Sequence, residues 1–159
     1  MKNRNQLALG FLLGAATAGI CLLSLQQHCI NSWMERAEKS RGLFRLMDQW
    51  VNVKQEKKNI DEYFRKYHYK RIAIYGMGYV GQRLLKELKN SEVEIAYGID
   101  RNAENIDTEI KMVTIKEELA DIDAVVITLI DEFDGVKEVL SEQLSCPIIA
   151  IEDIINEIS

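Results

Sequence analysis

The sequence predicts an α/β lobe with a parallel, doubly wound β-sheet, and three observations lead to this fold class. From residue 70 to the end of the 159-residue chain, short apolar segments alternate with helical patterns. The first of these segments runs into a glycine-rich turn followed by a helical pattern. Residues 124–130 (AVVITLI) are almost continuously apolar, as expected for a strand that is covered on both faces.

The glycine-rich turn is the most specific feature of the chain. Residues 71–75 (RIAIY) form the first expected strand, and a helix is expected over residues 79–88. The turn between them has G-x-G-x-x-G spacing in the strand–turn–helix context of a Rossmann-like dinucleotide site. We expect its backbone to bind the phosphates of NAD or NADP at the positive end of the helix, through Gly76, Met77, Gly78, Tyr79, Val80 and Gly81.

Each glycine of the turn has its own expected role. Gly76 permits the tight turn, Gly78 lets a diphosphate approach the main chain, and Gly81 allows the helix to pack closely on the strand.

A second strand is expected over residues 93–99, and Asp100 follows it. An acid at this distance from the turn accepts hydrogen bonds from the adenosine ribose hydroxyls and repels a 2′-phosphate, which favours NAD. Arg101 comes next, and a cation there favours NADP instead. The balance leans slightly to NAD, while a solvated loop acid is the alternative interpretation of Asp100.

The remaining elements complete a five-stranded sheet. Further strands are expected over residues 109–113, 124–130 and 146–151, with helices after Thr114, over 132–144 and over 152–158. Asp131 is expected to cap the helix over 132–144. Right-handed crossovers then give the strand order 3-2-1-4-5, with a ligand crevice between the first and fourth strands that includes Thr128.

The N-terminal part predicts a different organisation: a tail (1–6), a transmembrane helix (7–25) and a helical linker (26–69) before the nucleotide-binding domain (70–159). Residues 7–25 carry no charge and, as a helix, would span about 28 Å, close to the hydrocarbon thickness of a bilayer. A cleaved signal peptide, with Ala16-Thr17-Ala18 as its cleavage site, is the less favoured alternative. Basic residues that follow the span place the C-terminal domain in the cytoplasm of a single-pass cell-membrane protein.

The linker is expected to be helical and amphipathic. Trp33, Ala37, Phe44, Met47 and Val51 share one face, which Leu43, Leu46 and Trp50 widen. We expect this stripe to pack on the lobe or on the membrane surface, with a short coiled coil as runner-up. The linker and the G-x-x-x-G at Gly10 and Gly14 each offer a route to a homo-oligomer. A second short helix is expected from the capping-box spacing of Asn59 and Glu62.

Composition and charge exclude several functions. Residues 72–159 hold seven Lys/Arg against nineteen Asp/Glu, which argues against binding nucleic acid. No Cys/His spacing resembles a metal site. The helix over 132–144 has Lys137 but lacks the tyrosine that short-chain reductases place four residues before a lysine, and the acids Asp131, Glu132 and Asp134 are typical of a helix start. No complete catalytic constellation is visible, so enzymatic activity stays open.

Several segments resemble a small bacterial family of Rossmann-like NAD(P)-binding domains encoded among capsule and surface-polysaccharide genes. They are KRIAIYGMGYVGQRLLKELK, IAYGIDRNAENI and DAVVITLIDEFDGVKEVLSEQLSCPIIAIEDIINEI, joined to LMDQWVNVKQEKKNIDEYFRKYHYKR upstream. The resemblance covers residues 43–159 and implies nucleotide or dinucleotide binding at Gly76, Gly78, Gly81 and Asp100. It also implies a context of cell-surface glycan synthesis. Family members often carry a small or acidic residue where Tyr79 and Val80 stand here.

Three functions follow from these features. The preferred one is a membrane-anchored nucleotide- or dinucleotide-binding module, accessory to surface-polysaccharide biosynthesis, whose partners are the membrane, a nucleotide or nucleotide-sugar, and glycan-biosynthesis proteins. The second is an NAD(P)-dependent oxidoreductase or nucleotide-sugar-modifying enzyme completed by a partner subunit. The third is a structural interaction domain with a vestigial nucleotide site.

Overall fold

The computed structural model describes the backbone of residues 2–119 and 121–159 and the side chains of residues 26–119 and 121–159. The chain divides into two compact units, Met1–Arg41 and Gly42–Ser159. Helix α1 (Lys2–Gln55) supplies the first unit and the first residues of the second. The expected membrane span, residues 7–25, lies outside the described side chains. Among the side chains that are described, no helix combines the length and apolarity needed to cross a membrane.

The second unit contains a five-stranded parallel sheet in the order β3-β2-β1-β4-β5, which confirms the predicted topology. The strands are β1 (Arg71–Tyr75), β2 (Glu94–Ile99), β3 (Met112–Val113), β4 (Ala124–Ile127) and β5 (Ile148–Ala150). The helices of this unit after α1 are α2 (Asp61–Lys66), α3 (Tyr79–Leu88), α4 (Phe133–Ser141) and α5 (Ile151–Ile158), with a 3₁₀ turn, η1 (Ala103–Asn105), after β2.

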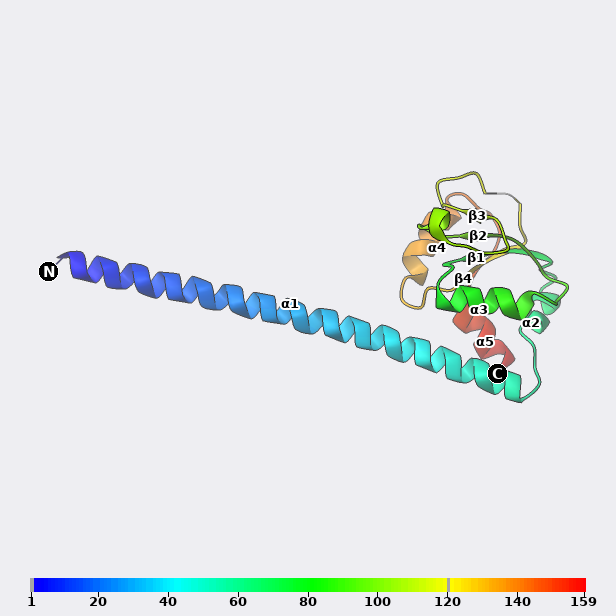
Figure 1. Ribbon diagram of the computed structural model, residues 1–159, viewed down its shortest axis with the longest axis horizontal. Coiled ribbons are helices and arrows are strands. Elements are labelled where there is room, and N and C mark those ends of the chain that lie inside the picture. Colours follow the sequence, from blue (N-terminus) through cyan, green and yellow to red (C-terminus); the bar gives the residue numbers. More distant parts are fainter. Residues whose placement is uncertain (1, 120) are drawn as a thin grey trace. The chain divides into compact units, whose positions relative to one another are not determined.

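Helices cover both faces of the sheet (Figure 1). One face carries Ile72 and Ile74 of β1 and packs against α3, α5, α2 and the end of α1. The other face carries Ala73 and Tyr75 and packs against α4. Because both faces are covered, β4 is apolar at every position and fully buried, as the sequence predicts.

The strand register brings the carboxyl ends of the strands to one edge. Tyr75 pairs with Ile99 on one side and with Ile127 on the other, while Ile99 pairs with Val113. The residues that follow these strand ends, Gly76, Asp100, Thr114 and Thr128, therefore emerge side by side. This edge is where open α/β sheets bind their ligands.

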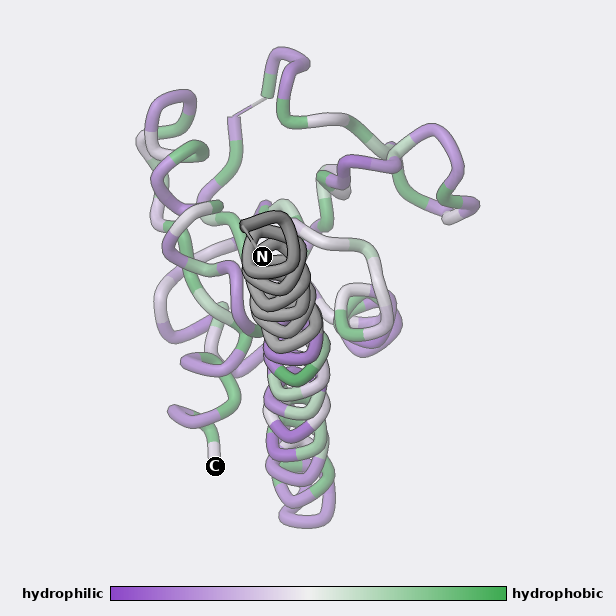
Figure 2. The backbone as a smooth tube through the Cα atoms, turned by 90° about the vertical axis from the view of Figure 1, so that its left-hand side faces the viewer, coloured by the Kyte–Doolittle hydropathy of each residue, from purple (hydrophilic) through white to green (hydrophobic). Residues whose placement is uncertain are grey.

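The end of α1 packs on the lobe through one side of the predicted stripe. Leu46, Trp50 and Val53 are buried in the core at helical spacing, whereas Phe44 is 74% and Val51 52% exposed. In the first unit Trp33 is also exposed. Figure 2 shows hydrophobic and hydrophilic residues interleaved along the described part of α1, so the period alone offers more than one apolar face. Of the predicted stripe, Leu46 and Trp50 pack on the lobe and Leu43 and Met47 are partly buried beside them, whereas Phe44 and Val51 do not pack on it.

Replacing Trp50 by alanine should test this assignment. The indole is 93% buried by its neighbours (7% exposed), so we expect Trp50→Ala to lower the free energy of unfolding by about 3 kcal/mol. Phe44→Ala removes an exposed ring from the same helix and should change that free energy by less than about 0.5 kcal/mol. Urea unfolding of both variants checks the pair, and equal losses would contradict the packing described here.

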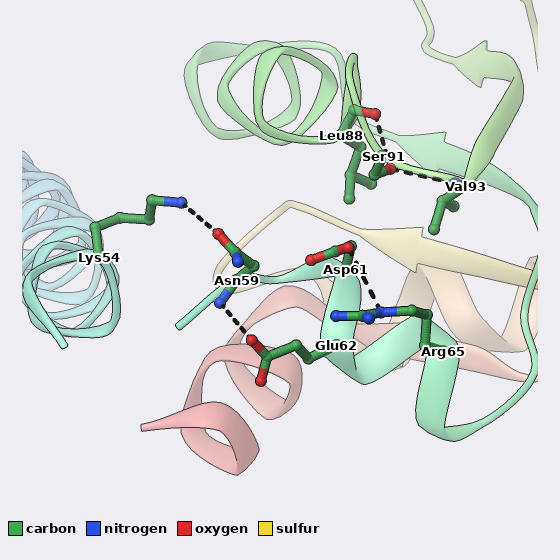
Figure 3. Close-up of polar contacts among 8 residues, drawn as sticks. All are labelled: Lys54, Asn59, Asp61, Glu62, Arg65, Leu88, Ser91 and Val93. Carbon is green, nitrogen blue, oxygen red and sulfur yellow. Dashed lines mark hydrogen bonds and ion pairs between the residues drawn. The ribbon is translucent and has the colours of Figure 1, made fainter. Parts of the chain in front are cut away.

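The turn from α1 into α2 uses half of the predicted capping box (Figure 3). The Asn59 backbone N–H donates to Glu62 Oε1 at 3.2 Å, whereas the Asn59 side-chain oxygen accepts from Lys54 Nζ at 3.2 Å. Asp61 and Arg65 add an ion pair at 3.6 Å along α2. The contacts tie α2 to the end of α1, and Tyr63 and Phe64 then enter the core.

Several element boundaries differ from those predicted. Strand β3 begins at Met112, three residues later than predicted, and Glu109 pairs with Lys89 at 2.7 Å. Among the described residues 114–119 the expected helix does not form: Glu117 Oε1 accepts from the Thr114 amide at 2.7 Å, but only Ile115 and Lys116 form a turn. So short a segment gains too few hydrogen bonds to offset the cost of helix nucleation.

Helix α4 starts later than predicted and without the predicted cap. Glu132, and not Asp131, occupies the N-cap position, and among the described residues no side chain caps the helix. Asp131 instead lines a cavity at the strand ends, described below.

Asp123 fastens the start of β1 to the start of β4. Its Oδ2 accepts hydrogen bonds from the Lys70 and Arg71 backbone amides, each at 2.7 Å. These two hydrogen bonds hold the pKa of the Asp123 carboxyl below its usual range, and the bond from Arg71 has the larger effect. The carboxylate therefore stabilises the fold above the pKa that it has in the unfolded chain, and this contribution is lost as the pH falls through the lower, folded pKa.

Asp123→Asn should show this pH dependence. We expect the variant to lose about 1 kcal/mol or less at neutral pH, because the side chain is exposed. The difference between the variant and the unaltered chain should shrink as the pH falls below about 4. Urea unfolding at pH 7 and at pH 3 measures both quantities. A difference that stays constant with pH would contradict the assignment.

Candidate dinucleotide-binding site

The glycine-rich turn leaves β1 and enters α3 at the carboxyl edge of the sheet. The Gly76 amide donates to the Ile99 carbonyl at 2.8 Å, which continues the pairing of β1 with β2 by one residue. Gly76 then takes φ +89°, a value that L side chains rarely adopt. Leu129 Cδ2 would lie 2.9 Å from a Cβ added there. Conformation and space both require glycine at this position.

The other two motif glycines have opposite surroundings. A Cβ at Gly81 would overlap the Gly76 carbonyl oxygen, so the first turn of α3 lies directly against the main chain that leaves β1. A Cβ at Gly78 would meet nothing within 4 Å. Gly81 is therefore needed for packing, whereas Gly78 leaves open space in front of the backbone, as the approach of a diphosphate requires.

Helix α3 begins at this open position without a protein cap. Gly78 is its N-cap residue, and among the described residues no side chain hydrogen-bonds to the N–H groups of its first turn. Such N–H groups, at the positive end of the helix dipole, form a binding site for an anion.

The side chains between the glycines differ in burial. Met77 is 1% exposed and Val80 belongs to the core beneath α3. Tyr79 is exposed, and the Arg83 guanidinium lies 5.0 Å from the centre of its ring. The bulk of Tyr79 is thus directed to solvent, and Met77, Tyr79 and Val80 present their main chain to the site.

Asp100 lies against the turn, as its place after β2 predicts. Its Oδ2 accepts from the Met77 amide at 2.8 Å and its Oδ1 accepts from the Asn102 amide at 2.9 Å. Each carboxylate oxygen keeps a further lone pair, so Asp100 can still accept hydrogen bonds from ribose hydroxyls. The two amides hold the carboxylate next to the phosphate position, and this geometry fits the predicted role.

Thr128 hydrogen-bonds to the main chain of the glycine turn. The residue is 4% exposed, and its Oγ1 lies 3.1 Å from the Tyr75 carbonyl oxygen and 2.5 Å from that of Gly76. The hydroxyl donates its one proton to these two carbonyl oxygens. The sequence places Thr128 in the ligand crevice, and the structure places its side chain where it positions Gly76. Strand β4 ends at Ile127, three residues before the predicted end, so Thr128 follows the strand and its side chain can reach the turn.

Thr128→Val should test whether the Thr128 hydroxyl holds the glycine turn in position. The valine keeps the volume and leaves two carbonyl oxygens without the hydroxyl, so we expect a loss of about 1–3 kcal/mol in unfolding free energy. Thermal and urea unfolding measure the loss, and Thr128→Ser, which keeps the hydroxyl, should lose clearly less. Equal losses in the two variants would show that the hydroxyl does not brace the turn.

A cavity of about 900 Å³ extends from the strand ends toward α4. Tyr75 and Arg101 line it from β1 and from the end of β2, and the start of α4 closes the opposite side. Its full lining is Tyr75, Arg101, Thr114, Ile115, Lys116, Ile130, Asp131, Glu132, Phe133, Asp134, Gly135, Val136 and Val139. The lining includes neither Asp100 nor a residue of the glycine turn, although Tyr75 and Arg101 are their neighbours in the chain.

Arg101 crosses this cavity to reach α4. Its Nη2 lies 2.9 Å from Glu132 Oε2, and both side chains are largely exposed. A hydrogen bond with the Tyr75 hydroxyl, followed by the charge of Glu132, raises the pKa of the Arg101 guanidinium. Tyr75, Thr114, Lys116 and Glu132 were not predicted to belong to the site. The register of the parallel strand ends is the signal that indicates Tyr75 and Thr114.

The other chemically active side chains lie elsewhere. His28 and His68 line none of the three cavities described for the chain. Helix α4 offers Lys137, whose Nζ lies 5.4 Å from the centre of the Phe133 ring, and it contains no tyrosine. Among the described residues, no group of three His, Cys, Asp or Glu side chains is arranged to hold a metal ion. The site is therefore equipped to bind, and its lining shows no histidine or cysteine.

The fold, the glycine turn and the acid after β2 define a Rossmann-type dinucleotide-binding domain. Residues 38–142 match the NAD-binding domain of the D-isomer specific 2-hydroxyacid dehydrogenases, and the chain belongs to this family. The family domain binds NAD, consistent with the predicted NAD or NADP cofactor. The match says nothing of capsule or surface-polysaccharide synthesis. No curated protein and no solved structure gives a significant match to the chain.

Proposed function

We propose that this protein is a membrane-anchored NAD-binding module that serves an assembly for cell-surface polysaccharide synthesis. The observation that carries the binding function is the open backbone at Gly78, flanked by the uncapped start of α3 and by the carboxylate of Asp100. Membership in an NAD-binding family supports the same ligand. The anchor rests on the uncharged residues 7–25, and the glycan context rests on the resemblance stated above.

The binding function can be tested on the full chain in mild detergent by a thermal-shift panel. The panel contains NAD, NADP, UDP-glucose and inorganic diphosphate. NAD present at 100 times its dissociation constant should contribute about 2.7 kcal/mol, which raises the melting temperature by several degrees. The nucleotide-sugar should give a smaller shift, since it lacks the second nucleoside, which we expect to extend into the 900 Å³ cavity. No shift with NAD or NADP at millimolar concentration would refute the proposal.

The anchor is tested separately by membrane fractionation. The full chain should stay in the membrane pellet after a carbonate wash, whereas a variant with three lysines introduced within residues 7–25 should be released. Full-length chain in the supernatant would contradict the anchor and leave the dinucleotide site unaffected.

A second candidate function is an oxidoreductase whose substrate-binding and proton-transferring groups come from a partner. The observation that favours it is the family itself, since its domains serve dehydrogenases. This function predicts NADH formation from a 2-hydroxy acid only when the partner is added. If the Asp100→Ala variant turns over at the same rate and with the same KM for NAD, the cofactor is not bound in this site.

A further inference from the structure

Two neighbouring residues at the end of β2 make opposite demands on the cofactor. The Asp100 carboxylate, held by the Met77 and Asn102 amides, suits the ribose hydroxyls of NAD and repels the 2′-phosphate of NADP. The guanidinium of Arg101 is the group that would bind such a phosphate, because it offers several donors in a planar fork. Sequence alone leaves the choice between them open.

The structure shows that Arg101 is already engaged. Its Nη2 lies 2.9 Å from Oε2 of Glu132, the N-cap residue of α4, 31 positions further along the chain. Tyr75, at the end of β1, lines the same cavity as Arg101. The ion pair thus joins the β2 end of the cavity to its α4 side. The cavity lining contains one other cation, Lys116.

We propose that Glu132 sets the cofactor preference of this site toward NAD by holding Arg101 in an ion pair across the cavity. This inference rests on the proposed NAD-binding function and names the residue that gives it selectivity. A 2′-phosphate bound to Arg101 would have to share the guanidinium with the Glu132 carboxylate and lie close to that carboxylate and to Asp100, both negatively charged. NAD needs no cation at this position, because its 2′-hydroxyl donates to Asp100, so the ion pair can stay intact when NAD binds.

Glu132→Gln tests the proposal, because the amide has nearly the same shape without the charge. Glu132 makes no capping hydrogen bond to α4, so the fold should be preserved, which a thermal melt verifies. Isothermal titration of the full chain with NAD and with NADP gives both dissociation constants. We expect NADP to bind about fivefold more tightly to the variant, the effect of releasing a largely exposed ion pair, and NAD to change by less than about twofold.

Two further variants show whether Glu132 acts through Arg101. Glu138→Gln removes the same charge from an exposed position of α4 that does not line the cavity, and it should leave the NADP-to-NAD ratio unchanged. Arg101→Ala should make NADP binding weaker than it is in the unaltered chain. In the Arg101→Ala background, Glu132→Gln should no longer improve NADP binding, because the group that it releases is missing.

The outcomes separate this inference from the function on which it rests. If the unaltered chain binds neither dinucleotide, the proposed function fails and the inference fails with it. If NAD binds but Glu132→Gln leaves the NADP-to-NAD ratio unchanged, the inference alone is overturned. An improvement that persists without Arg101 also overturns it, since Glu132 would then act by direct repulsion of the phosphate.

Discussion

Replacing Gly78 by alanine should remove most of the affinity for NAD while the fold stays intact. The added methyl meets no protein atom within 4 Å, and φ −73° is accessible to any residue, so the cost to folding is limited to a weaker N-cap, about 1 kcal/mol or less. The same methyl occupies the space through which a diphosphate approaches the main chain. A steric cost of about 1–3 kcal/mol corresponds to a dissociation constant raised about tenfold to a hundredfold.

The measurement is isothermal titration of both chains with NAD, accompanied by urea unfolding without ligand. Unchanged affinity in a folded Gly78→Ala variant would mean that the diphosphate does not approach the turn at this residue. A large loss of stability would mean instead that the space in front of Gly78 is not open.

Replacing Gly81 by alanine should have the reverse effect and destabilise the protein before any ligand is considered. The new Cβ would overlap the Gly76 carbonyl oxygen, which is main chain and is itself held by Thr128. To relieve the overlap, α3 must move away from β1, at an expected cost of about 3 kcal/mol after the better helix propensity of alanine is included. The melting temperature should fall by about 10 °C.

Gly135→Ala is the matched control for this loss. Gly135 is also a helical glycine, and a Cβ there meets nothing within 4 Å. Its replacement should maintain stability or raise it by up to about 1 kcal/mol. Should both variants melt together, the loss at Gly81 would have to be ascribed to something other than contact with the Gly76 carbonyl.

Local patterns predicted the parts of this protein that local chemistry determines. The strand order follows from alternating elements and right-handed crossovers, and the turn follows from three glycines of which two prove sterically required. Asp100 reaches the turn because parallel strands end at one edge, which the order of the elements already implies.

Other features depend on side chains that meet only after folding. The predicted stripe of α1 included both the exposed Phe44 and Val51 and the buried Leu46 and Trp50, and periodicity cannot tell which side of a broad apolar stripe is buried. The Arg101–Glu132 pair joins two loops across the cavity, and no spacing rule links them. Sequence places Thr128 in the ligand crevice, but only the folded structure shows that its hydroxyl bonds to the main chain of the turn.

The proposed NAD binding requires, above all, that the main chain at the start of α3 bind the diphosphate. Hydrogen–deuterium exchange of the full chain, with and without saturating NAD, tests this most directly, because it reports on individual backbone amides. We expect NAD to slow exchange in the peptide that contains residues 77–81, with little change in α5, none of whose residues lines the cavity. Saturating NAD that leaves the exchange of residues 77–81 unaltered would contradict the account.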